Sequence, residues 1–188
     1  MNPDILRAHV EALATSSGRE VGSSGHEEAR RYLLDRLRSI PGLEPAGAAG
    51  FVQPYEGEHA EGMANIIARI PGSDPSLAPV LLGAHYDTAG PLPGADDNAA
   101  AVAILLELLP RLLALKLERP VLAAFFDAEE PPCFQKSSMG STHWYKHQRQ
   151  SPVHCAVIMD LVGHDVPMPG GEHLLFVTSD RISAFDVI

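Results

Sequence analysis

Short apolar segments with turn residues between them constrain this chain more than any other feature. There are four of them: ANIIARI (64–70), PVLLGAH (79–85), PVLAAFF (120–126) and VHCAVIMDL (153–161). Runs of this kind are typical of strands buried on both faces of a sheet. Helical patterns alternate with them, and this alternation predicts an α/β fold with helices on both sides of a sheet that is mostly parallel in its centre.

Helical patterns occupy three segments between or before these strands: 3–13, 25–40 and 99–117. Asn2 and Pro3 are a suitable N-cap and first position for the first helix, and Pro41 ends the second. The chain has 188 residues, of which 45% are hydrophobic. That is enough for one globular domain with a sizeable core, so we expect a single domain over residues 1–188.

Charge and hydropathy exclude some partners. The formal net charge of −10 argues against nucleic acid, whose binding needs a basic surface. The most apolar stretch, 99–117, contains Glu107 and Arg111, so we interpret it as a core helix rather than a membrane span. Asp4 and Arg7 stand where a signal peptide needs an apolar run, which favours a cytoplasmic protein.

Ionisable side chains follow three of the predicted strands. Ligands in α/β sheets bind at the carboxyl ends of the strands, so side chains placed there should gather at one edge. The third predicted helix also begins near this edge, just after the pair Asp96 and Asp97. The residues at or just beyond the ends of these apolar runs are His85 and Asp87 for the second, Asp127, Glu129 and Glu130 for the third, and Asp160 for the fourth.

One histidine among several carboxylates is a ligand set for zinc or a related divalent ion. The two cysteines, Cys133 and Cys155, lie far apart and outside any CxxC pattern, so we expect them to be ordinary thiols. Asp97 is a candidate bridge between two ions, which lie roughly 3.5–4 Å apart in two-metal sites. Asp87 is placed to accept a hydrogen bond from the second ring nitrogen of His85.

The two adjacent glutamates Glu129 and Glu130 can have different roles. Adjacent side chains point in different directions, so one glutamate can bind metal while the other takes a proton from water. Each of these features alone has a plainer interpretation, as a polar strand terminus, a helix cap or a solvated surface acid. Their occurrence in order at the predicted strand ends is what favours a metal site.

Together these motifs resemble the co-catalytic di-zinc aminopeptidases of metallopeptidase family 28. The resemblance rests on NIIARIPG, LLGAHYDT, GADDNAAAVAILLELL, FFDAEE, MGS and IMDLVG, and it covers residues 5–170. It implies a three-layer α/β sandwich of the zinc exopeptidase (phosphorylase/hydrolase-like) type, with a mixed sheet that is parallel in its centre. It also implies hydrolysis of N-terminal peptide bonds and therefore a peptide substrate.

The resemblance assigns metal ligands by position. His85, Asp97 and Asp160 would bind one zinc ion. Asp97 would be shared with a second zinc ion, to which Glu130 would also bind. The family therefore implies two zinc ions with a bridging aspartate.

The resemblance also assigns the catalytic roles. Glu129 would be the general base that deprotonates the metal-bridging water, and Asp87 would orient His85. Asp96 would only neighbour the site. A cis peptide bond is expected after Asp97.

The C-terminal part departs from the family pattern. The sequence reaches Ile188 without the stretch that supplies a last histidine to the second zinc, so we expect a domain incomplete at its C-terminus, one complete zinc site and an exposed sheet edge. Residues 174–188 instead resemble a segment of phosphoribosylaminoimidazole-succinocarboxamide synthase. Four histidines do not match the final motif and are expected to be surface or partly buried: His143, His147, His164 and His173.

Two alternatives to an active aminopeptidase stay open. Glutaminyl cyclases have a related fold and bind one zinc ion, which would suit an incomplete second site. The GADDN sequence favours the peptidase over the cyclase pattern. The other alternative is an inactive relative that binds one metal ion or none.

Overall fold

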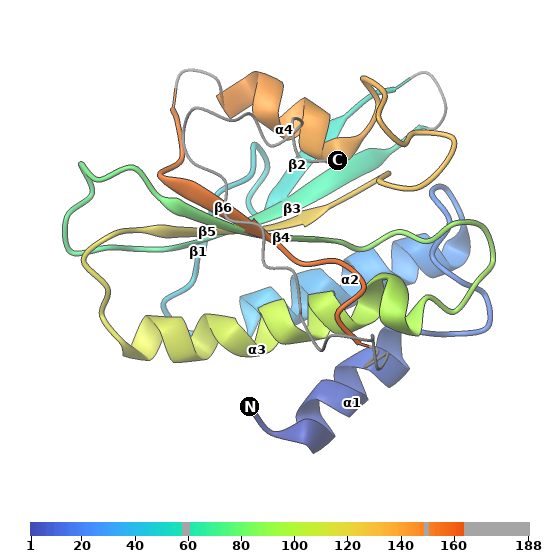
Figure 1. Ribbon diagram of the computed structural model, residues 1–188, viewed down its shortest axis with the longest axis horizontal. Coiled ribbons are helices and arrows are strands. Elements are labelled where there is room, and N and C mark those ends of the chain that lie inside the picture. The colour runs from blue at the N-terminus through green and yellow to red at the C-terminus, as the bar shows by residue number, and fades with distance from the viewer. Residues whose placement is uncertain (58–60, 149–150, 164–188) are drawn as a thin grey trace, which may run out of the picture.

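The computed structural model describes residues 1–57, 61–148 and 151–163. Within these ranges the chain forms a six-stranded sheet with helices on both faces (Figure 1). The strands are β1 (Glu44–Pro45), β2 (Val52–Tyr55), β3 (Met63–Ile70), β4 (Val80–His85), β5 (Val121–Phe126) and β6 (Cys155–Ile158). The helical elements are α1 (Pro3–Leu13), α2 (Ser24–Arg38), the irregular turn η1 (Ala95–Ala100), α3 (Ala101–Ala114) and α4 (Gly140–Gln148).

The sheet is mixed, with a parallel part and an antiparallel part. β4 lies between β5 and β6 and is parallel to both. β3 is antiparallel to β5 on one side and pairs with the short strands β1 and β2 in antiparallel fashion. This arrangement confirms the predicted α/β fold with a mixed, centrally parallel sheet.

The register of the parallel strands aligns their carboxyl ends. His85 of β4 is paired with Phe126 of β5, and Gly83 of β4 with Ile158 of β6. The chain therefore leaves all three strands at the same edge of the sheet. The predicted gathering of the residues that follow these strands depends on this alignment.

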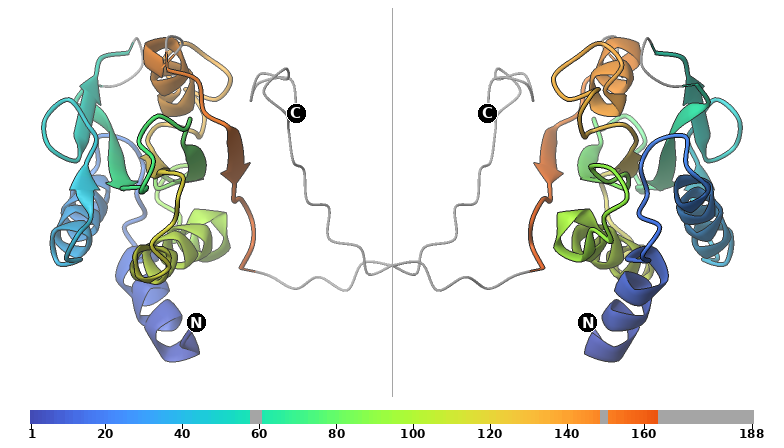
Figure 2. Two further views of the ribbon diagram at one scale, coloured as in Figure 1. Left: turned by 90° about the vertical axis from the view of Figure 1, so that its left-hand side faces the viewer. Right: turned by 90° about the vertical axis from the view of Figure 1, so that its right-hand side faces the viewer.

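The helices form unequal outer layers. α1, α2 and α3 cover one face, while α4 covers the other (Figure 2). The larger core lies under the first group and includes Leu33 of α2, Leu105 of α3 and Phe125 of β5. On the opposite face, Trp144 of α4 packs edge-to-face against Phe126, with ring centroids 6.1 Å apart. The predicted three layers are therefore present.

Local signals set where several helices begin. The side chain of Asn2 accepts a hydrogen bond from the backbone N–H of Asp4, as expected for the N-cap of α1. The predicted core helix begins at Ala101, two residues later than expected, because η1 precedes it. The expected cis peptide bond joins Asp97 to Asn98. None of the helices in the described ranges is long and apolar enough to cross a membrane.

Two parts of the sheet differ from the sequence expectation. The strands β1 and β2 are not predicted, because they have only two and four residues and no sustained apolar run. β6 is less buried than expected, since Ile158 at its end is 51% exposed. The reason is its position at the edge of the described sheet, where it has β4 as a neighbour on one side.

Candidate metal centre

His85 lies at the middle of the candidate site. It is the last residue of β4 and is only 4% exposed. Its Nε2 atom lies 3.0 Å from Oδ1 of Asp97, 3.5 Å from Oδ1 of Asp160 and 3.9 Å from Oε2 of Glu129. Neither ring nitrogen makes a hydrogen bond of good geometry, so the imidazole is buried with its nitrogens available to another partner.

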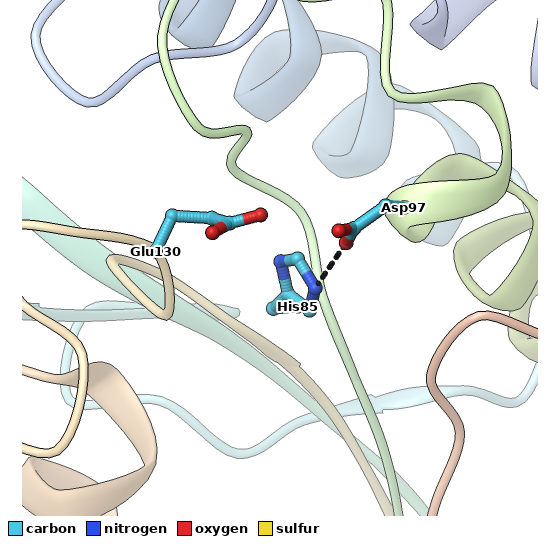
Figure 3. Close-up of side chains that lie close together, drawn as sticks. All are labelled: His85, Asp97 and Glu130. Atoms are coloured by element: carbon cyan, nitrogen blue, oxygen red, sulfur yellow. Dashed lines mark ion pairs between the residues drawn. The ribbon is translucent and has the colours of Figure 1, made fainter.

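Three of the predicted ligands form one compact group. One ligand atom each from His85, Asp97 and Glu130 lies within 4.8 Å of the other two. Figure 3 shows Asp97 reaching the imidazole from η1 while Glu130 points in from the opposite side, after β5. The two carboxylates point toward each other beside the imidazole, and ligand atoms that converge in this way could share a cation.

Asp160 and Glu129 lie next to this group but outside it. Asp160 follows β6, approaches His85 and has a side chain that is 51% exposed. The side chain of Glu129 is less exposed, at 27%. The structure therefore brings every predicted site residue to one edge of the sheet, with the closest association among His85, Asp97 and Glu130.

Asp87 contacts both sides of the centre. Its Oδ1 atom lies 3.3 Å from Nδ1 of His85. The same carboxylate accepts hydrogen bonds from the backbone N–H groups of Glu129 and Glu130, each at 3.0 Å. It is fully buried. Asp87 is thus placed to hold both His85 and the turn that carries Glu129 and Glu130, which we call the acidic turn. The sequence predicts only the contact with His85.

Carboxylates dominate the electrostatics of the site. Burial tends to lower the pKa of His85, but Asp160, Asp87 and Asp97 outweigh it and raise that pKa to about 12. Burial raises the pKa of Glu129 to about 7, with help from neighbouring carboxylates. The carboxylates concentrate negative charge in a partly buried space, and a bound cation would neutralise this charge.

The donor set fits a divalent metal such as zinc. It combines a buried imidazole whose nitrogens lack hydrogen-bond partners with carboxylates from two other elements. Imidazole nitrogen and carboxylate oxygen are both common zinc ligands. His85 also has Asp87 behind its other ring nitrogen, which is the usual second partner of a metal-binding histidine.

Arg19 is a buried side chain that sequence reasoning missed. It is 1% exposed, and its guanidinium donates hydrogen bonds of 2.7–3.0 Å to carbonyl groups. Three of these carbonyls belong to the segment 86–94, which connects His85 to η1. Nothing in the sequence marks a single arginine in a loop as the support of this segment. The acceptors are Leu13, Tyr86, Pro93 and Gly94.

The contact between His26 and Asp127 is a second feature that sequence reasoning missed. Nε2 of His26 in α2 lies 2.7 Å from Oδ1 of Asp127, and both residues are buried. The His26 ring stacks on Tyr86 with an interplanar angle of 2°. The sequence marks Asp127 only as an acid at a strand end, and no local pattern pairs it with a histidine 101 residues earlier.

The remaining histidines do not join the centre in the described part of the chain. His143 and His147 lie on α4 with ring centroids 4.1 Å apart, and His143 also stacks on Tyr55. They are half-buried and exposed respectively, as expected. His164, His173 and the segment 174–188 lie outside the described residues.

Comparison with known proteins identifies relatives over most of the chain. The model of peptidase family M28 matches residues 65–178. The uncharacterized protein YfbL of Escherichia coli is 35% identical over 118 residues, which cover 58% of this chain and 35% of YfbL. A probable leucine aminopeptidase of Trichophyton verrucosum is 29% identical over 127 residues, covering 63% of this chain and 33% of that protein.

Solved structures agree with the fold. LapB from Legionella pneumophila has a TM-score of 0.70 at 21% identity and covers 87% of this chain and 44% of LapB. The glutaminyl cyclase of Porphyromonas gingivalis has a TM-score of 0.69 at 25% identity, covering 86% of this chain and 60% of the cyclase. The chain spans about a third of the length of the two sequence relatives above. On the family match, which extends over more than half of its length, the chain belongs to peptidase family M28.

Proposed function

We propose that this chain carries the metal centre of a zinc-dependent aminopeptidase that hydrolyses N-terminal peptide bonds. The observation that supports this most directly is the grouping of His85, Asp97 and Glu130 within 4.8 Å. Membership of a peptidase family and a relative named as a probable leucine aminopeptidase add support. The expected substrate is a peptide with a free N-terminus.

The geometry and the family resemblance support a division of the proposed ligands between two ions. His85, Asp97 and Asp160 would hold one zinc ion, because both carboxylates lie within 3.5 Å of Nε2 of His85. Asp97 and Glu130 would contribute to a second ion, with Asp97 shared. When bound, zinc acts as a Lewis acid that polarises a carbonyl group and lowers the pKa of water.

Glu129 is the proposed general base. Its carboxylate lies 3.9 Å from Nε2 of His85 but outside the three-residue ligand group, so it is available for proton transfer. It would take a proton from the attacking water and deliver it to the leaving amine. Its backbone N–H donates to Asp87, which holds the start of the side chain in place.

A glutaminyl cyclase is the second candidate. The likeness to the Porphyromonas gingivalis cyclase favours it, and so does the single group of three ligands found in the described residues. In a cyclase of this type, the α-amine of an N-terminal glutamine would attack the carbon of its own side-chain amide and ammonia would leave, with Glu129 transferring the proton from the amine to the leaving ammonia. It would need one zinc ion rather than two.

Metal stoichiometry separates these candidates. Zinc per chain would be measured by elemental analysis after zinc loading and removal of free metal, for wild type, Asp97→Ala, Glu129→Gln and the exposed control Glu118→Gln. We expect Asp97→Ala to lose zinc while the other two variants keep it. Two zinc ions per wild-type chain would favour the aminopeptidase, and one would favour the cyclase.

Activity assays then test the base. Glu129→Gln should lower kcat by roughly a hundredfold to ten-thousandfold, the usual contribution of general acid–base catalysis. The substrates would be aminoacyl anilides for the peptidase and N-terminal glutaminyl peptides for the cyclase. A zinc-loaded wild-type protein that turns over neither substrate would overturn the proposed function in both forms.

A further inference from the structure

A small cavity opens beside the metal centre. Its volume is about 180 Å³, and its lining includes Glu20, Val21, Asp87, Glu130, Pro132 and Cys133. Glu130 therefore belongs both to the proposed ligand group and to the cavity wall. A molecule held at the metal centre would have this cavity next to it.

Apolar groups contribute half of the cavity lining, and carboxylates and a threonine contribute the rest. Val21, Pro131, Pro132 and Cys133 contribute hydrocarbon or thiol surface, and Cys133 is buried in a cluster against which Val21 packs. This apolar part of the lining would exclude water from an aliphatic stem and gain free energy from its burial. The volume suits one side chain rather than a longer stretch of peptide.

The carboxylates around the cavity differ in what they already bind. Both oxygens of Asp87 accept backbone N–H groups, and Glu130 is a proposed metal ligand. Glu20 is exposed and forms no ion pair with any residue in the described ranges. Glu20 is therefore the lining carboxylate that is free to meet a cation.

The backbone next to Glu20 is anchored to the site. The N–H of Arg19 donates to Oγ1 of Thr88 at 2.7 Å, and the N–H of Thr88 donates to the carbonyl of Arg19 at 3.3 Å. Thr88 directly follows Asp87 and also lines the cavity. These two hydrogen bonds hold Glu20 at the rim rather than leaving it on an unattached loop. The guanidinium of Arg19 points to backbone carbonyls and does not neutralise Glu20.

We propose that this cavity receives the side chain of the substrate's N-terminal residue and that Glu20 favours lysine or arginine there. The apolar walls would cover the methylene stem, while the carboxylate at the rim would pair with the cationic end. The inference rests on the proposed function, because it assumes that a free N-terminus is held at the metal centre.

Binding of two matched amines tests the inference without catalysis. L-lysinol and L-norleucinol have the same α-amine and nearly the same stem, but only lysinol has a cationic tip. Calorimetry on the zinc-loaded chain should show lysinol binding about two- to fivefold tighter, the range for an exposed ion pair. The preference should shrink at high salt, because the charges are exposed.

Two variants locate the effect. Glu20→Gln keeps the size of the side chain and should abolish the preference, whereas Glu28→Gln, an exposed glutamate on α2 outside the cavity lining, should keep it. Equal binding of the two amines by wild type would overturn the inference. So would a lysinol preference that persists in Glu20→Gln.

Hydrolysis of lysyl and norleucyl anilides separates this inference from the proposed function. Turnover of both anilides at the same kcat/KM would refute the cationic preference while supporting an aminopeptidase. Loss of the lysinol preference in Glu20→Gln without turnover of any anilide would support the cation-binding cavity and refute the aminopeptidase.

Discussion

The two sides of the metal centre are built in different ways. On one side, the acidic turn after β5 has its backbone held by two fully buried carboxylates, those of Asp127 and Asp87. On the other side, Asp97 and Asp160 have side chains that are 46% and 51% exposed. We call these the supported half and the open half. The difference separates residues that hold the fold from residues whose proposed role is metal binding alone.

The supported half is anchored through Asp127. Its carboxylate accepts hydrogen bonds from the backbone N–H groups of Ala64 at 2.7 Å and Ala128 at 2.8 Å, besides its contact with His26. Ala128 has a φ of +53°, a left-handed conformation that costs about 1–2 kcal/mol for a residue with a Cβ atom. The contacts of Asp127 and Asp87 offset this cost and aim Glu129 and Glu130 toward His85.

The open half has fewer internal ties. The side chain of Asn98 donates to the carbonyl of Met159 at 3.0 Å, and the N–H of Gly163 donates to Asp96 at 2.7 Å. These hydrogen bonds join η1 to the segment after β6, but neither involves the carboxylate of Asp97 or Asp160. A metal ion is thus expected to order the open half more than the supported half.

The largest effect on folding is expected in the supported half, from Asp127→Ala. This substitution leaves the ring nitrogen of His26 and two backbone N–H groups buried without acceptors, so the free energy of unfolding should fall by about 3–5 kcal/mol. Urea unfolding of the metal-free protein measures the loss. Asp35→Ala, which removes an exposed carboxylate from α2, should change it by less than about 1 kcal/mol. A loss below about 1 kcal/mol for Asp127→Ala would refute the distinction between the halves.

An intermediate effect is expected from Asp87→Asn, also in the supported half but next to His85. An asparagine keeps the size of the side chain but has only one acceptor oxygen, so one amide of the acidic turn loses its partner. Zinc affinity should fall roughly 10- to 100-fold, as for other partners of metal ligands. Competition with a chromophoric chelator measures it. Asp74→Asn provides a control, because Asp74 accepts the N–H of Ser76 in an exposed turn; unchanged affinity in Asp87→Asn would show that Asp87 does not support the ligands.

The smallest effect on folding is expected in the open half, from Asp160→Asn. The free energy of unfolding of the metal-free protein should stay within about 1 kcal/mol of the wild-type value, because Asp160 is half exposed and solvent screens its attraction to His85. Zinc affinity should nevertheless fall, since Asp160 is a proposed ligand. Urea unfolding measures the stability of Asp160→Asn against wild type, and competition with a chelator measures its zinc affinity. A folding defect as large as that of Asp127→Ala would mean that both halves support the fold.

The sequence by itself determined the strands that form the parallel part of the sheet and the ionisable residues that follow them. Buried strands and their polar ends are local patterns, so the sequence alone predicts that His85, Asp97, Glu129, Glu130 and Asp160 gather at one edge. The quoted motifs also led to the family, which the family match confirms. The ligand and base roles stay predictions until metal and activity are measured.

Only the tertiary structure decided how that edge is supported. His26 meets Asp127 across 101 positions, and the side chain of Arg19 reaches carbonyls up to 75 positions away. The structure also decided which half of the centre is buried, because β6 lies at the edge of the described sheet while β5 lies inside it. Such contacts join residues with no common local pattern. They exist because a buried polar group must find a partner wherever the fold provides one.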